Sequence, residues 1–343
     1  MEKDVVLRNK AELILGGSVK LPKDYKVPVR ISRSTAGPGA GTHSVVFAFN
    51  GVRVKKTVSY DEGDFELHSD RGTLFITRKG KPFLYEVKIE PVVFHCPEQA
   101  FFNLDQRCIY NCAYCTSPLL DKNITKDLTD EKIVNMIEEA SKTQKIKSIA
   151  LTSGVVGSVQ ETVDRFVSCI GKLRAAFPET PIGVEPYVDS TEQIDALHNA
   201  GATEIKINCE AARKDIFEKV CPGLDYDNIF RMLEYAVSVF GKGAVTSNVI
   251  YGLGESDDDL IEIMVRLGMR GVAPGLRALK QTPVNKEGIH RALDDIAPIT
   301  PERMIYLAKE QKEIFRRYDL DTRSFKTMCF ECTCCDLVPF KDL

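Results

Sequence analysis

The sequence predicts an α/β protein with a small β-rich domain in front of it and a cysteine-rich extension behind it. Three observations predict this arrangement. Short strand-like runs fill the first 92 residues, strand-like and helical runs alternate after about residue 98, and four cysteines lie close to the end of the chain. We therefore expect a β-rich N-terminal domain at 1–92, a sheet-and-helix domain at 93–290, and a C-terminal helix with a cysteine-rich segment at 291–343.

The composition is that of an ordinary globular protein, with 43% hydrophobic residues, 28% charged residues and a formal net charge of −3. This balance gives no reason to expect nucleic acid or an anionic membrane as a partner. Apolar runs are too short to span a membrane, and residues 1–4 do not begin a signal peptide, so we expect a cytoplasmic protein. Thiols stay reduced in that compartment, and eleven cysteines therefore predict metal ligation rather than disulfides.

Four runs in the N-terminal region are rich in β-branched and aromatic residues, which favour strands. Glycine turns such as Asn50-Gly51 separate them. The expected strands are 45–49, 52–58, 73–77 and 83–89. Since nothing chemical marks this region, we expect it to cover one end of the next domain, with substrate docking as the alternative.

The middle of the chain alternates six strand-like runs with helical runs, which predicts βα units and a parallel sheet. Ser158, Ser190 and Ser256 open capping-box or near-capping-box patterns, and Thr300-Pro301 is a cap followed by proline at the first helical position. Six units are too few for a closed eight-stranded barrel. The strand candidates are 100–104, 146–152, 182–188, 204–208, 244–250 and 271–279.

Three cysteines on one short loop carry the strongest chemical signal. Cys108, Cys112 and Cys115 have the spacing Cys-x3-Cys-x2-Cys directly after the first strand of the sheet. Three thiolates can hold three irons of a 4Fe-4S cubane and leave the fourth iron without a protein ligand. An open coordination position distinguishes a catalytic centre from a structural one. A closed zinc site needs a fourth ligand, and no histidine lies beside this loop, so an iron–sulfur cluster is the favoured interpretation.

This loop resembles the signature of the radical S-adenosylmethionine (SAM) enzymes. The resemblance implies an open, partial (β/α)6 barrel at 93–290, with its reactive end at the carboxyl ends of the strands. It also implies that SAM binds the free iron and is cleaved to a 5′-deoxyadenosyl radical, which removes hydrogen from an unactivated carbon. A reductant such as ferredoxin would supply the electron.

The resemblance extends to residues that would bind SAM at the strand ends. The residues 248–255 are similar to the family's adenine motif, Gly-x-Ile-x-Gly-x-x-Glu, although asparagine replaces the first glycine. A carboxylate buried within a strand needs a cation or a donor, and for Glu185 we expect SAM to provide it. Arg277 is expected to bind either the SAM carboxylate or a substrate anion. The full set of expected SAM contacts is Tyr114, Ser153, Gly154, Glu185, Asn208, Glu210, Ile250, Gly252 and Arg277.

Residues 100–260 resemble the biotin and lipoyl synthases. The segments 207–210, 221–226 and 246–255 follow the order of the Asn-His-Asn-x-Glu, Arg-Pro-Gly-Ala-Asp-Tyr and Gly-Leu-Gly-Glu motifs of lipoyl synthases. The pattern is most similar to the archaeal-type lipoyl synthase, in which two radical SAM proteins together insert two sulfurs into a protein-bound octanoyl chain.

The C-terminal motif Cys329-x2-Cys332-x-Cys334-Cys335 is the second metal signal. Standard lipoyl synthases carry three cysteines for a second cluster before the barrel, where this chain has only Cys96. Adjacent cysteines cannot easily both reach one cluster, so either three of the four bind, or three bind together with an outside ligand such as Cys96. A zinc knot or a tail of free thiols is the alternative. A second cluster here would be the sulfur source, an electron relay or a substrate anchor.

The remaining cysteines receive simpler interpretations. Cys169 lies on an apolar helical face and is expected in the core. Cys209 is expected behind the sheet, on the face opposite to Asn208 and Glu210. Cys221 has no assigned role.

The leading hypothesis is a two-cluster radical SAM sulfurtransferase of the lipoyl synthase type. It would act on an octanoylated lipoyl carrier protein or peptide, with a second radical SAM protein as a partner. The first alternative is a radical SAM enzyme that modifies a carbon skeleton or a peptide and whose second cluster is structural or relays electrons. The other alternative is a non-catalytic iron–sulfur electron carrier or scaffold. Beyond its cofactors we assign no catalytic side chain.

Overall fold

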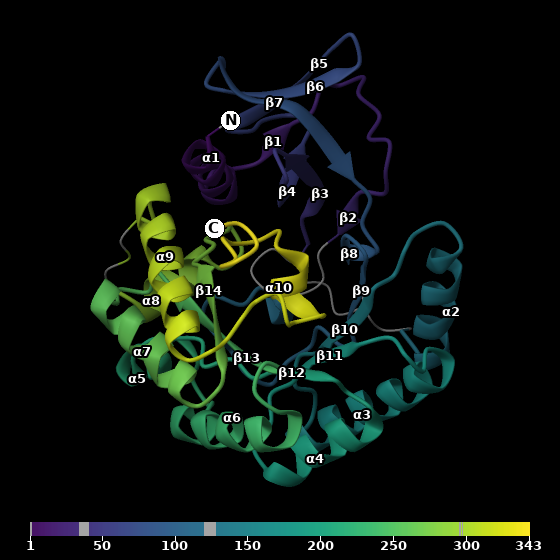
Figure 1. Ribbon diagram of the computed structural model, residues 1–343, viewed down its shortest axis with the longest axis vertical. Helices are drawn as coiled ribbons and strands as arrows, with labels where there is room; N and C mark the ends of the chain where they lie inside the picture. Colours follow the sequence, from purple (N-terminus) through teal and green to yellow (C-terminus); the bar gives the residue numbers. More distant parts are fainter. Residues whose placement is uncertain (1, 34–40, 120–127, 295, 297) are drawn as a thin grey trace.

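The computed structural model describes residues 2–33, 41–119, 128–294, 296 and 298–343. Its N-terminal part is a seven-stranded sheet with one helix, at the top of Figure 1. The strand order is β2-β3-β4-β1-β5-β6-β7, and an additional pairing of β3 with β7 curls the sheet. The elements are α1 (Lys3–Leu15), β1 (Val19–Lys20), β2 (Ser32–Arg33), β3 (His43–Phe49), β4 (Val52–Ser59), β5 (Phe65–Asp70), β6 (Thr73–Arg78) and β7 (Lys81–Glu90).

The four strands expected in this region are observed as β3, β4, β6 and β7. Helix α1 and strands β1, β2 and β5 were not predicted from the sequence. In α1 the face that packs inward contains Val6, Leu7 and Ala11 but also Lys10, and this charge interrupts the apolar stripe by which an amphipathic helix is recognised.

The second sheet also has seven strands, in the order β14-β13-β12-β11-β10-β9-β8. The strands from β9 to β14 are parallel, as predicted, and β8 pairs antiparallel with β9 at one edge. The sheet forms the open arc of a half-barrel (Figure 1). Its strands are β8 (Phe94–Cys96), β9 (Gln99–Asn103), β10 (Ser148–Thr152), β11 (Ile182–Glu185), β12 (Glu204–Lys206), β13 (Val245–Tyr251) and β14 (Ala273–Ala278).

Helices α3, α4 and α6 lie along the convex side of this arc (Figure 1). The predicted caps are confirmed: the Ser158 and Thr300 hydroxyls accept backbone hydrogen bonds, and Ser190 and Ser256 form capping boxes. The helical elements are η1 (Ser117–Leu119), α2 (Asp130–Ser141), α3 (Val159–Ala176), α4 (Thr191–Ala200), α5 (Lys214–Val220), α6 (Tyr226–Phe240), α7 (Asp257–Met269), α8 (Lys286–Ala292), α9 (Pro301–Arg317) and α10 (Met328–Cys332). In the described part of the chain, no helix combines the length and the apolar character that crossing a membrane requires.

The C-terminal segment lies within the arc of the sheet, with α10 near its centre (Figure 1). The Glu204 carboxylate on β12 accepts hydrogen bonds from the backbone N–H groups of Lys326 and Thr327. Gln99 on β9 exchanges two side-chain hydrogen bonds with the backbone of Met328. Gly183 on β11 leaves room for this segment, because a Cβ there would lie 2.0 Å from the Thr327 hydroxyl. The concave face of the sheet is therefore covered by the chain's own C-terminus.

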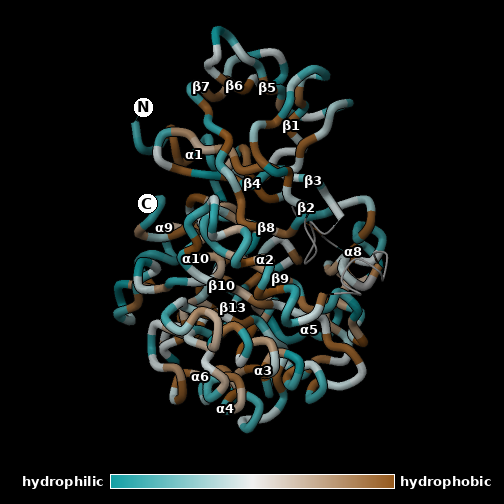
Figure 2. Tube along the Cα trace, turned by 90° about the vertical axis from the view of Figure 1, so that its right-hand side faces the viewer, coloured by the Kyte–Doolittle hydropathy of each residue, from teal (hydrophilic) through white to brown (hydrophobic). Residues whose placement is uncertain are grey.

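The N-terminal sheet holds the other side of the same segment. The Lys55 N–H donates to the Cys334 carbonyl at 3.0 Å, and the Arg53 Nε donates to the Cys332 carbonyl at 3.0 Å. Figure 2, turned by 90°, shows the same division into an upper β-sheet region and a lower half-barrel. The C-terminal segment thus joins the two sheets.

Candidate iron–sulfur and SAM site

The loop with Cys108, Cys112 and Cys115 follows β9 at the carboxyl end of that strand, as expected. Backbone hydrogen bonds hold it at two points. Ile109 N–H donates to the Val155 carbonyl at 2.8 Å, and Ala113 N–H donates to the Val220 carbonyl at 2.8 Å. The loop is therefore fixed against the segment after β10 and against the end of α5, although the three cysteines lie in neither helix nor strand.

Gly154 packs directly against this loop, and its substitution tests how the loop is held. A Cβ on Gly154 would lie 2.1 Å from the Arg107 carbonyl oxygen, which immediately precedes Cys108. We expect Gly154→Ala to displace the loop and to lower the iron bound per chain at least twofold after anaerobic reconstitution. Gly171→Ala, in helix α3 with no atom within 4 Å of the new Cβ, is the matched control. Equal iron contents in the two variants would contradict this expectation.

The three thiols fit a cluster better than a single ion. Burial raises the pKa of Cys108, and it raises the pKa of Cys115 to about 11, so iron must displace protons from thiols that are otherwise neutral. Within the residues that the structure describes, no three His, Cys, Asp or Glu side chains are arranged around one metal ion. A cubane instead takes its thiolates at separate iron corners. Cys108, Cys112 and Cys115 would hold three corners and leave one open.

Cys221, which the sequence analysis left without a role, lies against this loop. Its sulfur is 3.4 Å from the Tyr114 hydroxyl, and its thiol is hydrogen-bonded to Cys112. Tyr114 is itself buried, with a hydrogen bond to Glu210. No local pattern marks Cys221, because its neighbours come from a segment more than a hundred residues earlier.

Glu185 and Asn208 meet at the carboxyl ends of neighbouring strands. The Asn208 Nδ2 donates to Glu185 Oε1 at 2.8 Å, and Lys206 Nζ lies 2.8 Å from the same oxygen. The cation that the buried carboxylate was expected to need is therefore present within the chain. Lys206 was not predicted as part of this site, although a signal was present in the sequence. Lys206 and Asn208 are two residues apart, and side chains with this spacing in a strand point to the same face of the sheet.

Glu210 completes this group at the end of β12. It has a positive φ of 61° and forms an isolated bridge with Val249. Ile250 N–H donates to the Glu210 carbonyl at 2.7 Å, which ties this residue to β13. Tyr114, Glu185, Asn208, Glu210 and Ile250 thus converge beside the cysteine loop.

The carboxyl group of Glu210 predicts a pH dependence of stability. Burial, and then repulsion from Glu185, raises the pKa of Glu210 from 4.5 to about 7. The folded state therefore holds this proton more tightly than the unfolded chain. Its stabilising contribution is fully present below pH 4.5 and is lost as the pH rises through about 7. We expect Glu210→Gln to raise the free energy of unfolding by about 3 kcal/mol at alkaline pH.

Urea unfolding of the metal-free protein at a series of pH values measures this effect. The exposed Glu218→Gln variant on α5 is the control, and it should leave the pH dependence unchanged. A Glu210→Gln protein with the pH profile of the wild type would contradict the expectation.

The other expected SAM contacts lie in tight turns or face the C-terminal segment. The Ser153 hydroxyl donates to the Gly154 carbonyl at 2.8 Å. Gly252, with a φ of 96°, donates its N–H to Glu255, whose carboxylate also contacts Arg303 at 3.1 Å. Glu255 therefore has a structural role in this turn. Arg277 on β14 is hydrogen-bonded to Cys329.

The C-terminal cysteines and Cys96 lie near one another, and Cys335 is within electrostatic range of Cys96, Cys329 and Cys332. Cys332 is hydrogen-bonded to Cys334 and to Cys96, and these contacts lower the pKa of the Cys332 thiol well below its ordinary value. The sulfur of Cys329 lies 3.5 Å from Lys206 Nζ. Cys335 is accessible to solvent, although desolvation by the surrounding protein raises the pKa of its thiol to about 11. The expected outside thiol, Cys96, thus meets part of the C-terminal motif.

The two remaining cysteine predictions, for Cys169 and Cys209, concern burial. Cys169 is fully buried on α3 in the main core, as predicted. Cys209 is also fully buried, although it follows the end of β12 rather than lying within a strand. All eleven cysteines are free thiols.

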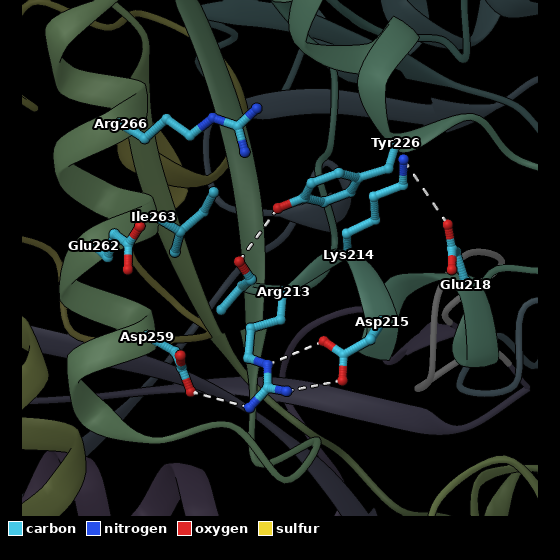
Figure 3. A pocket seen from close by; sticks show the side chains of 10 residues that line it. Arg213, Lys214, Asp215, Glu218, Tyr226, Asp259, Glu262, Ile263 and Arg266 are labelled. Atoms are coloured by element: carbon cyan, nitrogen blue, oxygen red, sulfur yellow. Dashed lines mark hydrogen bonds and ion pairs between the residues drawn. The ribbon is translucent and has the colours of Figure 1, made fainter.

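A pocket of about 520 Å³ lies apart from these residues, between α5 and α7 (Figure 3). Its charged side chains pair with each other: Arg213 with Asp215 and Asp259, and Lys214 with Glu218. Among the described residues that line it, none belongs to the cysteine loop or to the expected SAM contacts. We assign it no role in the chemistry.

The open parallel half-barrel places a three-cysteine loop at the carboxyl end of its first parallel strand, where three thiolates can hold an iron–sulfur cluster. Residues 103–267 match the family model described as the Radical SAM superfamily, and this part of the chain belongs to that superfamily.

Similar proteins with known functions come from several branches. The chain is 22% identical to a GTP 3',8-cyclase of Clostridium botulinum over 231 residues, covering 62% of this chain and 70% of the cyclase. It is 26% identical to a lipoyl synthase of Buchnera aphidicola over 185 residues, covering 53% of this chain and 56% of the synthase. It is also 26% identical to biotin synthase 2 of Corynebacterium diphtheriae over 221 residues, covering 59% of this chain and 64% of that synthase. These names do not single out one reaction.

Two solved structures share the fold. Methylornithine synthase has a TM-score of 0.51 at 15% identity, with 63% of each chain covered. The FeFe-hydrogenase maturase HydG of Carboxydothermus hydrogenoformans has a TM-score of 0.52 at 16% identity, with 64% of this chain and 52% of the maturase covered. The chain thus spans between half and two thirds of these structures, and the likeness shows the fold alone.

Proposed function

We propose that this protein is a radical SAM sulfurtransferase of the lipoyl synthase type. The first cluster and SAM would supply a 5′-deoxyadenosyl radical for activation of a protein-bound octanoyl chain, and the C-terminal cysteines would hold a second iron–sulfur cluster as the sulfur source. One observation carries this proposal: Cys329 lies 3.5 Å from Lys206, which pairs with Glu185, an expected SAM contact. The C-terminal cysteine segment therefore lies on the concave face where the radical would form.

The residues of the chain have distinct tasks in this proposal. Cys108, Cys112 and Cys115 hold the first cluster, which together with SAM supplies the radical chemistry. Glu185, Asn208 and Glu210 present oxygen and amide groups beside that loop, where they would bind the polar groups of SAM. Residues 325–338 cover the concave face and exclude water and stray hydrogen donors from it. The further partners are a reductant such as ferredoxin, an octanoylated lipoyl carrier protein or peptide, and a second radical SAM protein.

A second candidate is a radical SAM enzyme that modifies a carbon skeleton or a peptide, with a second cluster that is structural or relays electrons. The similarity to GTP 3',8-cyclases favours it, since the match covers 70% of the cyclase but only 56% of the lipoyl synthase. The cations Lys206 and Arg277 on the concave face also suit an anionic substrate.

Anaerobic turnover of the reconstituted full-length protein tests both candidates. SAM and dithionite should yield 5′-deoxyadenosine, and an octanoyl-lysine peptide should then gain sulfur while the second cluster is lost. Product formation with that cluster intact would overturn sulfur donation and support the second candidate. Absence of 5′-deoxyadenosine in the presence of an intact first cluster would overturn the enzymatic function and leave an electron carrier or scaffold.

A further inference from the structure

Cys221 follows the end of α5 and lies against the middle of the cysteine loop. The Ala113 N–H donates to the Val220 carbonyl at 2.8 Å, and these two residues are the chain neighbours of Cys112 and Cys221. The Cys221 thiol is hydrogen-bonded to Cys112. A backbone hydrogen bond and a side-chain hydrogen bond thus hold these two cysteines side by side.

The surroundings of Cys221 keep its thiol protonated. The residue is fully buried and belongs to the main apolar core. Burial in apolar surroundings disfavours a thiolate, so the S–H remains available as a donor. The Tyr114 hydroxyl lies 3.4 Å from the Cys221 sulfur. This sulfur can accept a hydrogen bond from the hydroxyl while its own S–H points to Cys112.

The other two cysteines of the loop also have hydrogen-bond donors beside them. Val155 N–H donates to the Cys108 sulfur at 3.4 Å, and the backbone and side chain of Ser117 are hydrogen-bonded to Cys115. Each sulfur that would bind an iron corner therefore has a donor next to it. The donor that the structure places beside Cys112 is the side chain of Cys221, so a substitution can remove it and leave the backbone in place.

Hydrogen bonds to the ligand sulfurs help to set the reduction potential of an iron–sulfur cluster. Reduction adds negative charge to the cluster and its thiolates, and a donor stabilises that charge. A donor beside Cys112 therefore makes the first cluster easier to reduce. This matters for a radical SAM protein, because the electron that cleaves SAM comes from this cluster.

We propose that Cys221 is a positioning residue of the first cluster, which donates its S–H to the Cys112 thiolate and thereby raises the reduction potential of the cluster. A fourth ligand would bind an iron of its own, whereas Cys221 is hydrogen-bonded directly to Cys112. The inference rests on the first cluster of the proposed function. It depends neither on sulfur insertion nor on a second cluster.

A redox titration of the reconstituted full-length protein, followed by electron paramagnetic resonance, tests this role. The signal that changes on addition of SAM reports the first cluster. We expect Cys221→Ala to keep the wild-type iron content and to lower the reduction potential. At the wild-type midpoint, the ratio of reduced to oxidised cluster should fall roughly fivefold. Cys169→Ala, which removes another fully buried thiol, is the matched control and should keep the wild-type midpoint.

Cys221→Ser is nearly isosteric and keeps a donor, so it tests the hydrogen bond even where alanine disturbs the fold. Its midpoint should be equal to or above that of the wild type, because a hydroxyl is a stronger donor than a thiol. A serine midpoint below that of the wild type would overturn the proposal. Loss of iron from a folded Cys221→Ser protein would also overturn it.

The outcomes separate this inference from the proposed function. If the wild type forms no cluster that responds to SAM, both fail. If the wild type forms that cluster and 5′-deoxyadenosine while Cys221→Ala keeps the wild-type midpoint, the role of Cys221 fails and the radical function stands.

Discussion

Serine in place of any one of Cys108, Cys112 and Cys115 is expected to remove the first cluster and all detectable 5′-deoxyadenosine formation. The reason is ligand chemistry, because a thiolate is a soft ligand for iron and a serine hydroxyl does not ionise at neutral pH. The loop itself contains no fourth cysteine, and backbone hydrogen bonds of Ile109 and Ala113 hold it in place. We expect the iron content to fall by about four per chain.

Electron paramagnetic resonance of the reduced protein and chromatography of the nucleoside products measure this loss. Cys169→Ser is the matched control, because Cys169 is fully buried in α3 and belongs to neither cysteine motif. A Cys108→Ser protein that cleaves SAM at the wild-type rate would show that this loop does not hold the reducing cluster.

Replacing Lys10 by methionine is expected to lower the free energy of unfolding by about 3–5 kcal/mol. Lys10 has a fully buried side chain on α1, and its Nζ lies 2.7 Å from both carboxylate oxygens of Asp342 and 2.8 Å from the Thr333 carbonyl. Without the cation, the carboxylate of Asp342, whose side chain is 4% exposed, stays buried and uncompensated. The C-terminal segment would then lose its attachment to α1.

Urea unfolding monitored by circular dichroism measures this change. The control is Arg8→Met, which breaks the exposed pair of Arg8 with Glu302 and should change the free energy of unfolding by less than about 1 kcal/mol. Adding Asp342→Leu to Lys10→Met should recover much of the loss, because it removes the unpaired charge. Similar stabilities for the Lys10 and Arg8 variants would refute the role of the buried pair.

Helices, strands and loops that are specified by residues close together in the sequence could be predicted from it. The parallel strands β10, β11 and β13 are short runs rich in apolar residues. The helices after Ser158 and Ser256 begin where a side chain satisfies free N–H groups of the first turn. The same holds for the cysteine loop, because its three cysteines lie within eight residues and their spacing alone predicts an iron–sulfur cluster. The helix α1 was missed because Lys10 on its inner face has its partner, Asp342, at the far end of the chain.

The sequence by itself therefore determined the half-barrel, its superfamily and the cysteine loop proposed to hold the first cluster, since these depend on periodicity, caps and cysteine spacing over short distances. Only the tertiary structure decided that Cys96 meets Cys332, that Lys206 neutralises Glu185, and that Cys329 turns toward the half-barrel. Each of these contacts joins segments whose approach is set by strand order and by the path of the C-terminal segment. Strand order and the path of the C-terminal segment leave no local pattern in the sequence. The partner of a side chain across the fold is specified by packing and not by its neighbours in sequence.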